Sequence, residues 1–346
     1  MQSITQKDFK LGPFQIDHPF ILAPMAGITN SPFRRLMRRM KSSVVVSELV
    51  SANGIEYGGQ RTLELLKFHD EERVVGLQIF GEDEGRLCKA SQLIEKLGAD
   101  FVDLNLGCPV SKVVTKGAGS AMCRNPLELG KILAAMVKSV KIPVTIKIRT
   151  GWDSESRNAH EVIQAAADAG VTWVAVHGRT RAQAYTGLAD WDFIGELKVK
   201  SPIPIIGNGD LTTPEMAVER MRTYGVDAVL IGRGALRNPF IFEQALSIWK
   251  GGSYSLPKAS NYIELMSTHK ILLNENFNER GALLHAKKFL SWYSAGFPGC
   301  HEFRSRVFKS EDPDQLWADA KEFFEISTAK RDMSYLTQPF LMGGHG

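Results

Sequence analysis

The feature that most constrains this chain is one pattern that recurs eight times between about residues 19 and 233. Each unit is a short apolar run that ends in glycine or a polar residue and leads into a stretch with helical spacing. The runs are apolar on both faces, which is typical of parallel strands covered by helices. We predict strands over residues 19–27, 43–50, 73–81, 101–109, 142–151, 172–180, 203–210 and 227–234, with helices over residues 84–99, 125–140 and 158–170.

Eight such units fit a (β/α)8 TIM barrel, whose usual length is about 250 residues. The alternative is an open, doubly wound parallel sheet, which gathers its informative polar residues at one switch point. Here nearly every apolar run ends in such residues, which favours the barrel. We therefore predict an α/β fold with a TIM barrel over residues 1–250.

The pattern changes after Phe242. Residues 251–260 are rich in Gly, Ser and Pro, which is typical of a linker. Beyond them, residues 261–276, 281–296 and 314–327 have helical spacing, and no strand is predicted. We predict an all-helical C-terminal domain over residues 261–346.

Composition narrows the class of protein further. The four cysteines form no CxxC pair, so the sequence indicates neither a zinc site nor an iron–sulfur site. A disulfide framework is not expected in a chain of this size without a secretion signal. No segment approaches the ~20 uninterrupted apolar residues that span a bilayer. The N-terminus lacks the apolar core of a signal peptide, so we expect a cytoplasmic protein without a membrane partner. A net charge of +4 permits a nucleic-acid partner without requiring one.

Two glycine-rich segments follow the last two predicted strands. They are IIGNGD (205–210) and LIGRGALRNP (230–239). In many barrels the loops after strands seven and eight bind phosphate through backbone N–H groups, and Arg233 would add a charged fork. Each segment alone could simply be a tight turn, but the pair at consecutive final strands favours a phosphate site.

Several polar side chains lie within otherwise apolar strands. Lys147 stands among Val and Ile residues, where a cation is costly unless an anion accompanies it. There it could stabilise negative charge on a reduced ring cofactor. Gln78 could read the amide edge of such a ring, and Met25 and Ala26 could form an apolar shelf beneath it. His177 ends the sixth strand, although a lone His is more often a hydrogen-bonded core residue. With the phosphate segments, these residues predict a barrel that binds flavin mononucleotide (FMN).

Cys108 lies between Gly107 and Pro109, at the carboxyl end of the fourth predicted strand. Parallel α/β folds build their sites at that end of the strands. A free cysteine more often behaves as a small buried apolar residue, and these neighbours alone favour that interpretation. The polar residues on the other strands reverse the preference, and we predict a thiol in the site.

Taken together, seven barrel segments closely resemble the tRNA-dihydrouridine synthase family. They are APMAGITNSPFR, LQIFG, DLNLGCPVSKVVTKGAGSAM, TIKIRTGW, VHGRTR, GNGD and IGRGAL. The resemblance covers residues 19–245 and continues through HAKKFLSWYSAGFPG and FRSRVF, which look like the bacterial B-type members. It implies an enzyme that reduces the C5–C6 double bond of particular uridines in tRNA, with hydride from reduced FMN to C6 and NADPH or NADH as the reductant.

The resemblance also implies roles for individual residues. Cys108 matches the family's general acid, Asn105 would hydrogen-bond the uracil, and Arg179 would lie close to substrate or phosphate. A cysteine with an ordinary pKa near 8.5 keeps its proton at neutral pH, which suits a proton donor to C5. The residues implied to hold FMN are Pro24, Met25, Ala26, Gln78, Lys147, His177, Asn208, Gly209, Asp210, Gly232 and Arg233.

A uridine within folded tRNA must be flipped out to reach a cofactor, which requires a surface that grips the RNA. Residues 280–309 carry six basic side chains, Lys287 and Lys288 among them, interleaved with aromatic residues. We predict that they contact tRNA, with a solvated helix face over an aromatic core as the alternative. The basic run 34–41 could equally be an ordinary helix face or an RNA contact. We expect a monomer.

Two other functions compete with this prediction. A flavin barrel that acts on a free pyrimidine, such as a dihydroorotate dehydrogenase, would not need a basic helical appendage. A tRNA-binding or folding factor without redox activity would not need Cys108 and Lys147.

Overall fold

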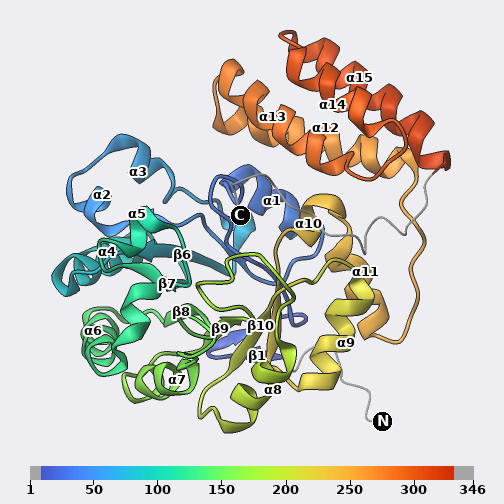
Figure 1. The fold of residues 1–346 in the computed structure, drawn as a ribbon. Helices are drawn as coiled ribbons and strands as arrows, with labels where there is room; N and C mark the ends of the chain where they lie inside the picture. The colour runs from blue at the N-terminus through green and yellow to red at the C-terminus, as the bar shows by residue number, and fades with distance from the viewer. Residues whose placement is uncertain (1–8, 331–346) are drawn as a thin grey trace.

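The computed structural model describes residues 9–330, and its centre is a closed parallel barrel (Figure 1). The sheet order is β4-β3-β11-β10-β9-β8-β7-β6, and a further pairing of β4 with β6 closes the ring. The prediction of a TIM barrel is therefore confirmed. Its strands are β3 (Phe20–Leu22), β4 (Val45–Val46), β6 (Val75–Phe80), β7 (Phe101–Leu106), β8 (Val144–Arg149), β9 (Val174–His177), β10 (Ile205–Asn208) and β11 (Ala228–Ile231).

The second predicted strand, residues 43–50, is interrupted in the structure. Val45–Val46 form β4, and a separate short strand, β5 (Val50–Ser51), pairs with the far end of β6. Between them, the Ser47 hydroxyl accepts a hydrogen bond from the backbone N–H of Gln78. The break turns Glu48 toward the loop after β3, where its carboxylate accepts from the backbone N–H of Gly27.

A short N-terminal hairpin fills the amino end of the barrel. It consists of β1 (Lys10–Leu11) and β2 (Phe14–Gln15), and Leu11 is fully buried. Phe14 packs against Phe101 and Trp173, with ring centroids 5.9 and 6.0 Å away. The Phe101 ring fits only because residue 76 is glycine, since a Cβ there would lie 2.2 Å from it.

Helices surround the barrel, and polar side chains fix where several of them begin. Asp83, Asn125, Asp190 and Thr213 each accept a backbone N–H of the first turn of the helix that follows. These helices are α4 (Glu84–Lys96), α6 (Pro126–Ser139), α8 (Trp191–Lys200) and α9 (Pro214–Tyr224). The other barrel elements are α1 (Ser31–Arg39), α2 (Ala52–Glu56), α3 (Gln60–Glu64), η1 (Asp70–Glu72), α5 (Ser111–Val114), η2 (Gly119–Arg124), α7 (Ala159–Asp168), α10 (Gly234–Arg237) and α11 (Ile241–Trp249).

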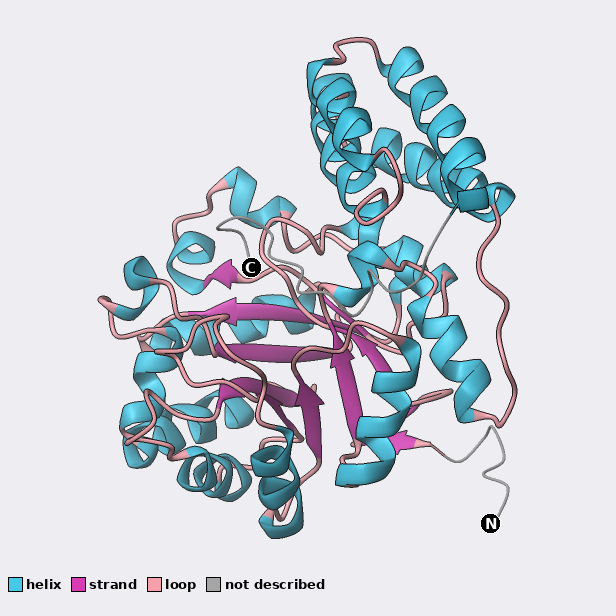
Figure 2. Cartoon of the chain, turned by 45° about the vertical axis from the view of Figure 1, so that its right-hand side comes forward, coloured by secondary structure: helices cyan, strands magenta, loops and turns pink. Residues whose placement is uncertain are grey.

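The C-terminal part of the described chain is a helical bundle, as predicted. It contains α12 (Ala259–Asn276), α13 (Glu279–Tyr293), α14 (Cys300–Lys309), α15 (Pro313–Ser327) and η3 (Thr328–Lys330). Figure 2 shows the four α-helices packed beside the barrel as a layer of their own, reached through an extended segment. Stacked ring pairs hold this layer together, such as Tyr262 with Phe324 at 4.7 Å and Phe303 with Phe323 at 4.1 Å.

Helix α14 is not among the helices predicted from the sequence. Its buried residues are Cys300, Phe303 and Val307, which have helical spacing but stand among polar and charged neighbours. That spacing was the available signal. The ends of the two predicted domains, residues 1–8 and 331–346, lie outside the described residues.

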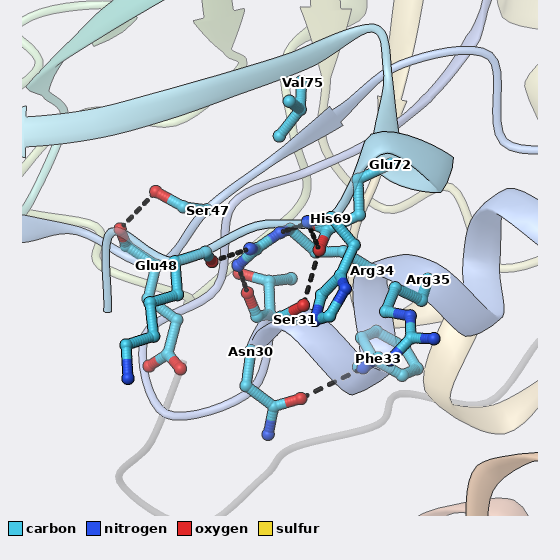
Figure 3. A network of polar contacts seen from close by, with 12 residues as sticks. Asn30, Ser31, Phe33, Arg34, Arg35, Ser47, Glu48, His69, Glu72 and Val75 are labelled. Atoms are coloured by element: carbon cyan, nitrogen blue, oxygen red, sulfur yellow. Dashed lines mark hydrogen bonds and ion pairs between the residues drawn. The ribbon is translucent and has the colours of Figure 1, made fainter. Parts of the chain in front are cut away.

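Helix α1 joins the barrel to the bundle. On its barrel side, fully buried Arg34 pairs with buried Glu72, and the guanidinium also donates to the carbonyls of Thr29 and Lys67 (Figure 3). Ser31 donates to the other oxygen of Glu72. Each charge is therefore paired and hydrogen-bonded, which is the condition for a buried ion pair to be tolerated.

The opposite side of α1 holds the bundle. The Phe33 ring stacks on Phe289 of α13 with centroids 4.9 Å apart, and Arg35 pairs with Glu275 of α12 at 2.7 Å. Asn30 lies 3.3 Å from His285 of α13. The basic run 34–41, which the sequence left open as an RNA contact, thus places Arg34 and Arg35 in internal ion pairs.

Candidate active site

A cavity of about 710 Å³ lies at the carboxyl ends of the barrel strands. Every barrel residue that the sequence singled out lines it. These residues are Pro24, Met25, Ala26, Gln78, Asn105, Cys108, Lys147, His177, Arg179, Asn208, Gly209, Asp210, Gly232 and Arg233. Because they come from seven different strands or the loops after them, the closure of the barrel is what brings them together.

Lys147 points into the barrel from β8, beside Asn105 of β7 in register. The pKa of Lys147 is lowered to about 8, chiefly by burial and also by the charge of Arg149, while the charge of Asp103 opposes both effects. At neutral pH the partly buried ammonium therefore carries its charge into the cavity. Such a group strongly favours an anion or a developing negative charge close by.

His177 is almost fully buried at the end of β9. Its Nε2 lies 3.3 Å from a guanidinium nitrogen of Arg179, which can only donate, so Nε2 is the acceptor and the ring is neutral. Burial lowers the pKa of His177 well below its ordinary value, and the charges of Arg149 and Lys147 lower it further. His177 thus offers an uncharged ring at the cavity wall.

A chain of hydrogen bonds runs below and beside the cavity from β8 to the loop after β7. Thr145 and Gln78 each donate to one oxygen of Asp103, both at 2.6 Å. The Gln78 carbonyl accepts from the Asn105 amide at 2.9 Å. The side-chain oxygen of Asn105 accepts from the backbone N–H of Cys108, also at 2.9 Å. Gln78 and Asn105, which were expected to contact cofactor and substrate, therefore also contact one another.

Cys108 is a half-buried free thiol at the cavity wall. Its carbonyl accepts a hydrogen bond from the Ser120 hydroxyl at 3.0 Å, and its N–H is held by Asn105. Cys123, by contrast, is buried behind the strand, where burial raises its pKa to about 12. Of these two cysteines, only Cys108 faces the cavity.

The glycine-rich end of the cavity has an unusual backbone. Gly209 has φ 134° and Asp210 has φ 53°, so two successive residues lie in the region that favours glycine. A Cβ at Gly209 would lie 2.4 Å from that of Ala189. The turn brings the backbone after β10 close to the loop after β9, and it leaves room on the cavity side.

Asp210 and Arg179 have a different arrangement from the one expected for direct phosphate contacts. Asp210 pairs with Arg179 at 2.8 Å, and Arg179 also donates to the carbonyls of Thr186 and Gly187. A carboxylate repels phosphate, so the Asp210 side chain serves to hold Arg179 and the loop after β9. Arg233 lies 3.8 Å from the other oxygen of Asp210.

Arg149 and Tyr185, which were not predicted from the sequence, also line the cavity. The Tyr185 ring lies between two guanidinium groups, 5.6 Å from that of Arg149 and 4.9 Å from that of Arg233. Arg149 has the same signal as Lys147, because it stands two residues further along the same apolar strand. Tyr185 lies in an irregular loop, and nothing in its neighbours in sequence marks it.

The two lysines predicted to contact tRNA lie on α13, outside the cavity. The Lys287 ammonium donates to the carbonyl of Phe308 at 3.3 Å and so holds the end of α14. Lys288 is exposed. Lys288 lies close enough to Glu48, in the loop after β4, for its charge to oppose the rise in the Glu48 pKa that burial causes. Lys288 is therefore on the side of α13 near the barrel loops.

Within residues 9–330, no group of three or more His, Cys, Asp or Glu side chains is arranged to hold a metal ion. In the same range, no helix combines the length and the apolar character needed to cross a membrane.

These features define a barrel enzyme with a thiol, a lysine and a glycine-rich turn around one cavity, and comparison with known proteins places it in a family. The sequence model of the dihydrouridine synthase family matches residues 21–331. The chain therefore belongs to the dihydrouridine synthase family, as its motifs predicted.

Its curated relatives match along nearly their whole length. It is 40% identical to tRNA-dihydrouridine synthase B of Pseudomonas aeruginosa, over 91% of this chain and 95% of that protein. It is 36% identical to the protein of the same name from Xanthomonas campestris, over 92% of this chain and 97% of that one. The resemblance to B-type members is confirmed by these names.

Solved structures with a similar fold are more distant in sequence. Histamine dehydrogenase from Rhizobium sp. 4-9 superposes with a TM-score of 0.55 at 12% identity, over 78% of this chain and 51% of that one. The 6-hydroxypseudooxynicotine amine oxidase of Pseudomonas geniculata gives a TM-score of 0.53 at 15% identity, over 75% and 51%. This chain thus spans about half of each of those chains, and the likeness concerns the fold.

Proposed function

We propose that this protein reduces the C5–C6 double bond of specific uridines in tRNA, with FMN as its cofactor and NADPH or NADH as the source of electrons. One observation carries the proposal. The residues that the family resemblance implies for cofactor and substrate all line one cavity, although they come from seven strands. Its relatives' names as tRNA-dihydrouridine synthases support the same conclusion.

The residues around the cavity fit FMN by their chemistry. The positive-φ turn at Gly209, the backbone of Gly232 and the guanidinium of Arg233 suit the phosphate. The charge of Lys147 suits a ring that becomes anionic on reduction, and Pro24, Met25 and Ala26 offer an apolar wall. FMN bound there would supply the hydride for C6 of the uracil.

Cys108 is then the group that donates a proton to C5. Its thiol lies at the cavity wall in the half-buried loop after β7, and its N–H and carbonyl are both held. The protonated thiol is the species that such a step requires. We also propose that Asn105 and Arg179 lie near the uracil. The Asn105 amide has a second hydrogen that is not used in its bond to Gln78.

We also propose the division of labour between the parts of the chain. Residues 1–250 form the catalytic domain, 251–260 the linker, and 261–346 the part that grips tRNA, with Lys288 at the face toward the barrel loops. We further propose that the protein is a monomer and that it acts in the cytoplasm.

The test uses purified protein and tRNA transcripts that lack dihydrouridine. The protein as isolated is expected to contain FMN, and with NADPH it is expected to convert uridine to dihydrouridine, measured by mass spectrometry of tRNA fragments. Cys108→Ala is expected to keep FMN and its reduction by NADPH but to lose at least about 100-fold in uridine reduction, since general acids contribute on that order. An unchanged rate of uridine reduction in this variant would remove Cys108 from the mechanism.

A further inference from the structure

Asp103 is a buried side chain that the proposed mechanism does not use. It lies on β7 with 4% of its surface exposed, one layer deeper in the barrel than Asn105 and Lys147. Thr145 donates to one of its oxygens and Gln78 to the other, at 2.6 Å each. A carboxylate this deep with two short hydrogen bonds is held in one orientation.

The two amides above Asp103 are each oriented by their neighbours. A carboxylate only accepts hydrogen bonds, so Gln78 must turn its NH2 group toward Asp103 and its carbonyl toward Asn105. Asn105 must then give its NH2 group to Gln78. Its oxygen is left to accept the backbone N–H groups of Gly107 at 3.3 Å and Cys108 at 2.9 Å.

The hydrogen bonds from the loop after β7 require the same orientation of the Asn105 amide. Two backbone N–H groups converge on the oxygen of Asn105, and an NH2 group in that place would leave both without an acceptor. The pKa of Asp103 is raised, chiefly by burial, and the bonds from Gln78 and Thr145 and the charge of Lys147 offset part of that effect. Both of its oxygens act as acceptors, as a carboxylate requires.

We infer that Asp103 is a positioning residue for Cys108, and that it acts by fixing the orientation of the Gln78 and Asn105 amides. We call the hydrogen-bonded series Asp103–Gln78–Asn105 the relay, and the direction in which its bonds run is its polarity. This polarity holds the Gly107–Cys108 turn and orients the thiol. The inference rests on the proposed function only for its effect on uridine reduction, because the position of the thiol can be measured without tRNA.

The decisive variant is Asp103→Asn. The introduced amide has the same shape but can donate to Gln78, which allows both amides to turn over and deprives the loop N–H groups of their acceptor. The readout is the rate at which iodoacetamide alkylates Cys108 in the FMN-bound protein, followed by peptide mass spectrometry to separate it from half-buried Cys88. We expect alkylation to become about tenfold faster, as two backbone hydrogen bonds are lost.

Two further variants distinguish the direction of these hydrogen bonds from a general loss of order around residue 103. Thr145→Val removes the other bond to the same carboxylate but leaves it accepting from Gln78, so Cys108 is expected to react as in the wild type. In the double variant Asp103→Asn with Gln78→Glu, the introduced carboxylate accepts both from the introduced amide and from Asn105. The original polarity then returns above it, and slow alkylation of Cys108 is expected to return as well.

In activity assays, Asp103→Asn is expected to slow uridine reduction about tenfold. Equal acceleration of alkylation in Asp103→Asn and Thr145→Val, or no recovery in the double variant, would overturn the inference. Unchanged alkylation in Asp103→Asn would do the same. If the alkylation pattern holds but no protein reduces uridine, the relay stands and the proposed function falls.

Should Asp103→Asn fail to fold, Asn105→Ala at the cavity end of the relay removes the acceptor directly. It is expected to accelerate alkylation of Cys108 to a similar degree, and an unchanged rate would count against the inference.

Discussion

Lys147 shows that a single residue can oppose the stability of the fold that holds it. Its pKa in the folded protein is about 8, below the 10.5 of an ordinary lysine. The folded state therefore binds this proton more weakly than the unfolded chain does. The barrel is accordingly less stable with Lys147 charged than it would be with an apolar side chain in its place, unless an anion is bound.

This predicts that Lys147→Met stabilises the FMN-free protein by about 3 kcal/mol at pH 7, from the difference between the two pKa values. The gain is expected to shrink as the pH rises from 8 toward 10.5, because the wild-type lysine then loses its charge in the folded state first. Denaturant unfolding at pH 7 and pH 9 measures it, with exposed Lys200→Met as the control. A less stable Lys147→Met protein at pH 7 would contradict the assignment.

At this scale the sequence was informative where a polar side chain interrupts an apolar strand, although Arg149 has that signal and was missed. Lys147 and Gln78 could be predicted for that reason and Asn105 from the family resemblance, and the structure places all three at the cavity. The sequence could not indicate that Gln78 and Asn105 bond to each other, because that depends on the register between β6 and β7. Tyr185 could not be found because its loop has no periodicity.

Among the elements, α1 couples the barrel to the helical bundle. The sequence showed its basic residues but not their partners, since Glu72 and Glu275 lie far along the chain. A run of arginines has the same appearance whether it faces RNA or pairs with distant carboxylates. The distinction required the packing of η1 and α12 on α1.

The contact between Phe33 and Phe289 can be tested directly. Both rings are buried, so Phe289→Ala is expected to destabilise the protein by about 3–5 kcal/mol and to slow uridine reduction. Reduction of FMN by NADPH is expected to stay unchanged, because the cavity lies on the other side of the joint. Phe308→Ala, at a ring that is 57% exposed on the same bundle, is the control with an expected change below about 0.5 kcal/mol. Equal losses in the two variants would contradict the role of the joint.

For the whole molecule, the barrel could be predicted because eight apolar runs leave few other solutions, and the bundle because strand patterns stop after residue 242. The angle at which the bundle meets the barrel could not be predicted, because it is set by contacts of α12 and α13 with α1, α10 and Phe240, which lie far from them in sequence. That angle decides which basic side chains face the barrel mouth.

The structure separates the two lysines that the sequence treated alike. Lys288→Ala is expected to weaken tRNA binding and to lower the slope of log affinity against log salt by about 1, as for loss of one phosphate contact. Lys287→Ala is expected to change the slope less, because its ammonium already binds the carbonyl of Phe308. Filter binding at several salt concentrations measures both, and equal slopes in the two variants would contradict this difference.

The hairpin of β1 and β2 has a consequence for the order of events in catalysis. Because Phe14 and Leu11 fill the amino end of the barrel, the cavity is closed at that end, and its entrance lies at the carboxyl end. A nicotinamide and a flipped uridine would have to enter by the same route and to contact the flavin ring one after the other. Steady-state rates measured at several concentrations of NADPH and tRNA are therefore expected to give parallel double-reciprocal lines, whereas intersecting lines would mean that both substrates fit at once.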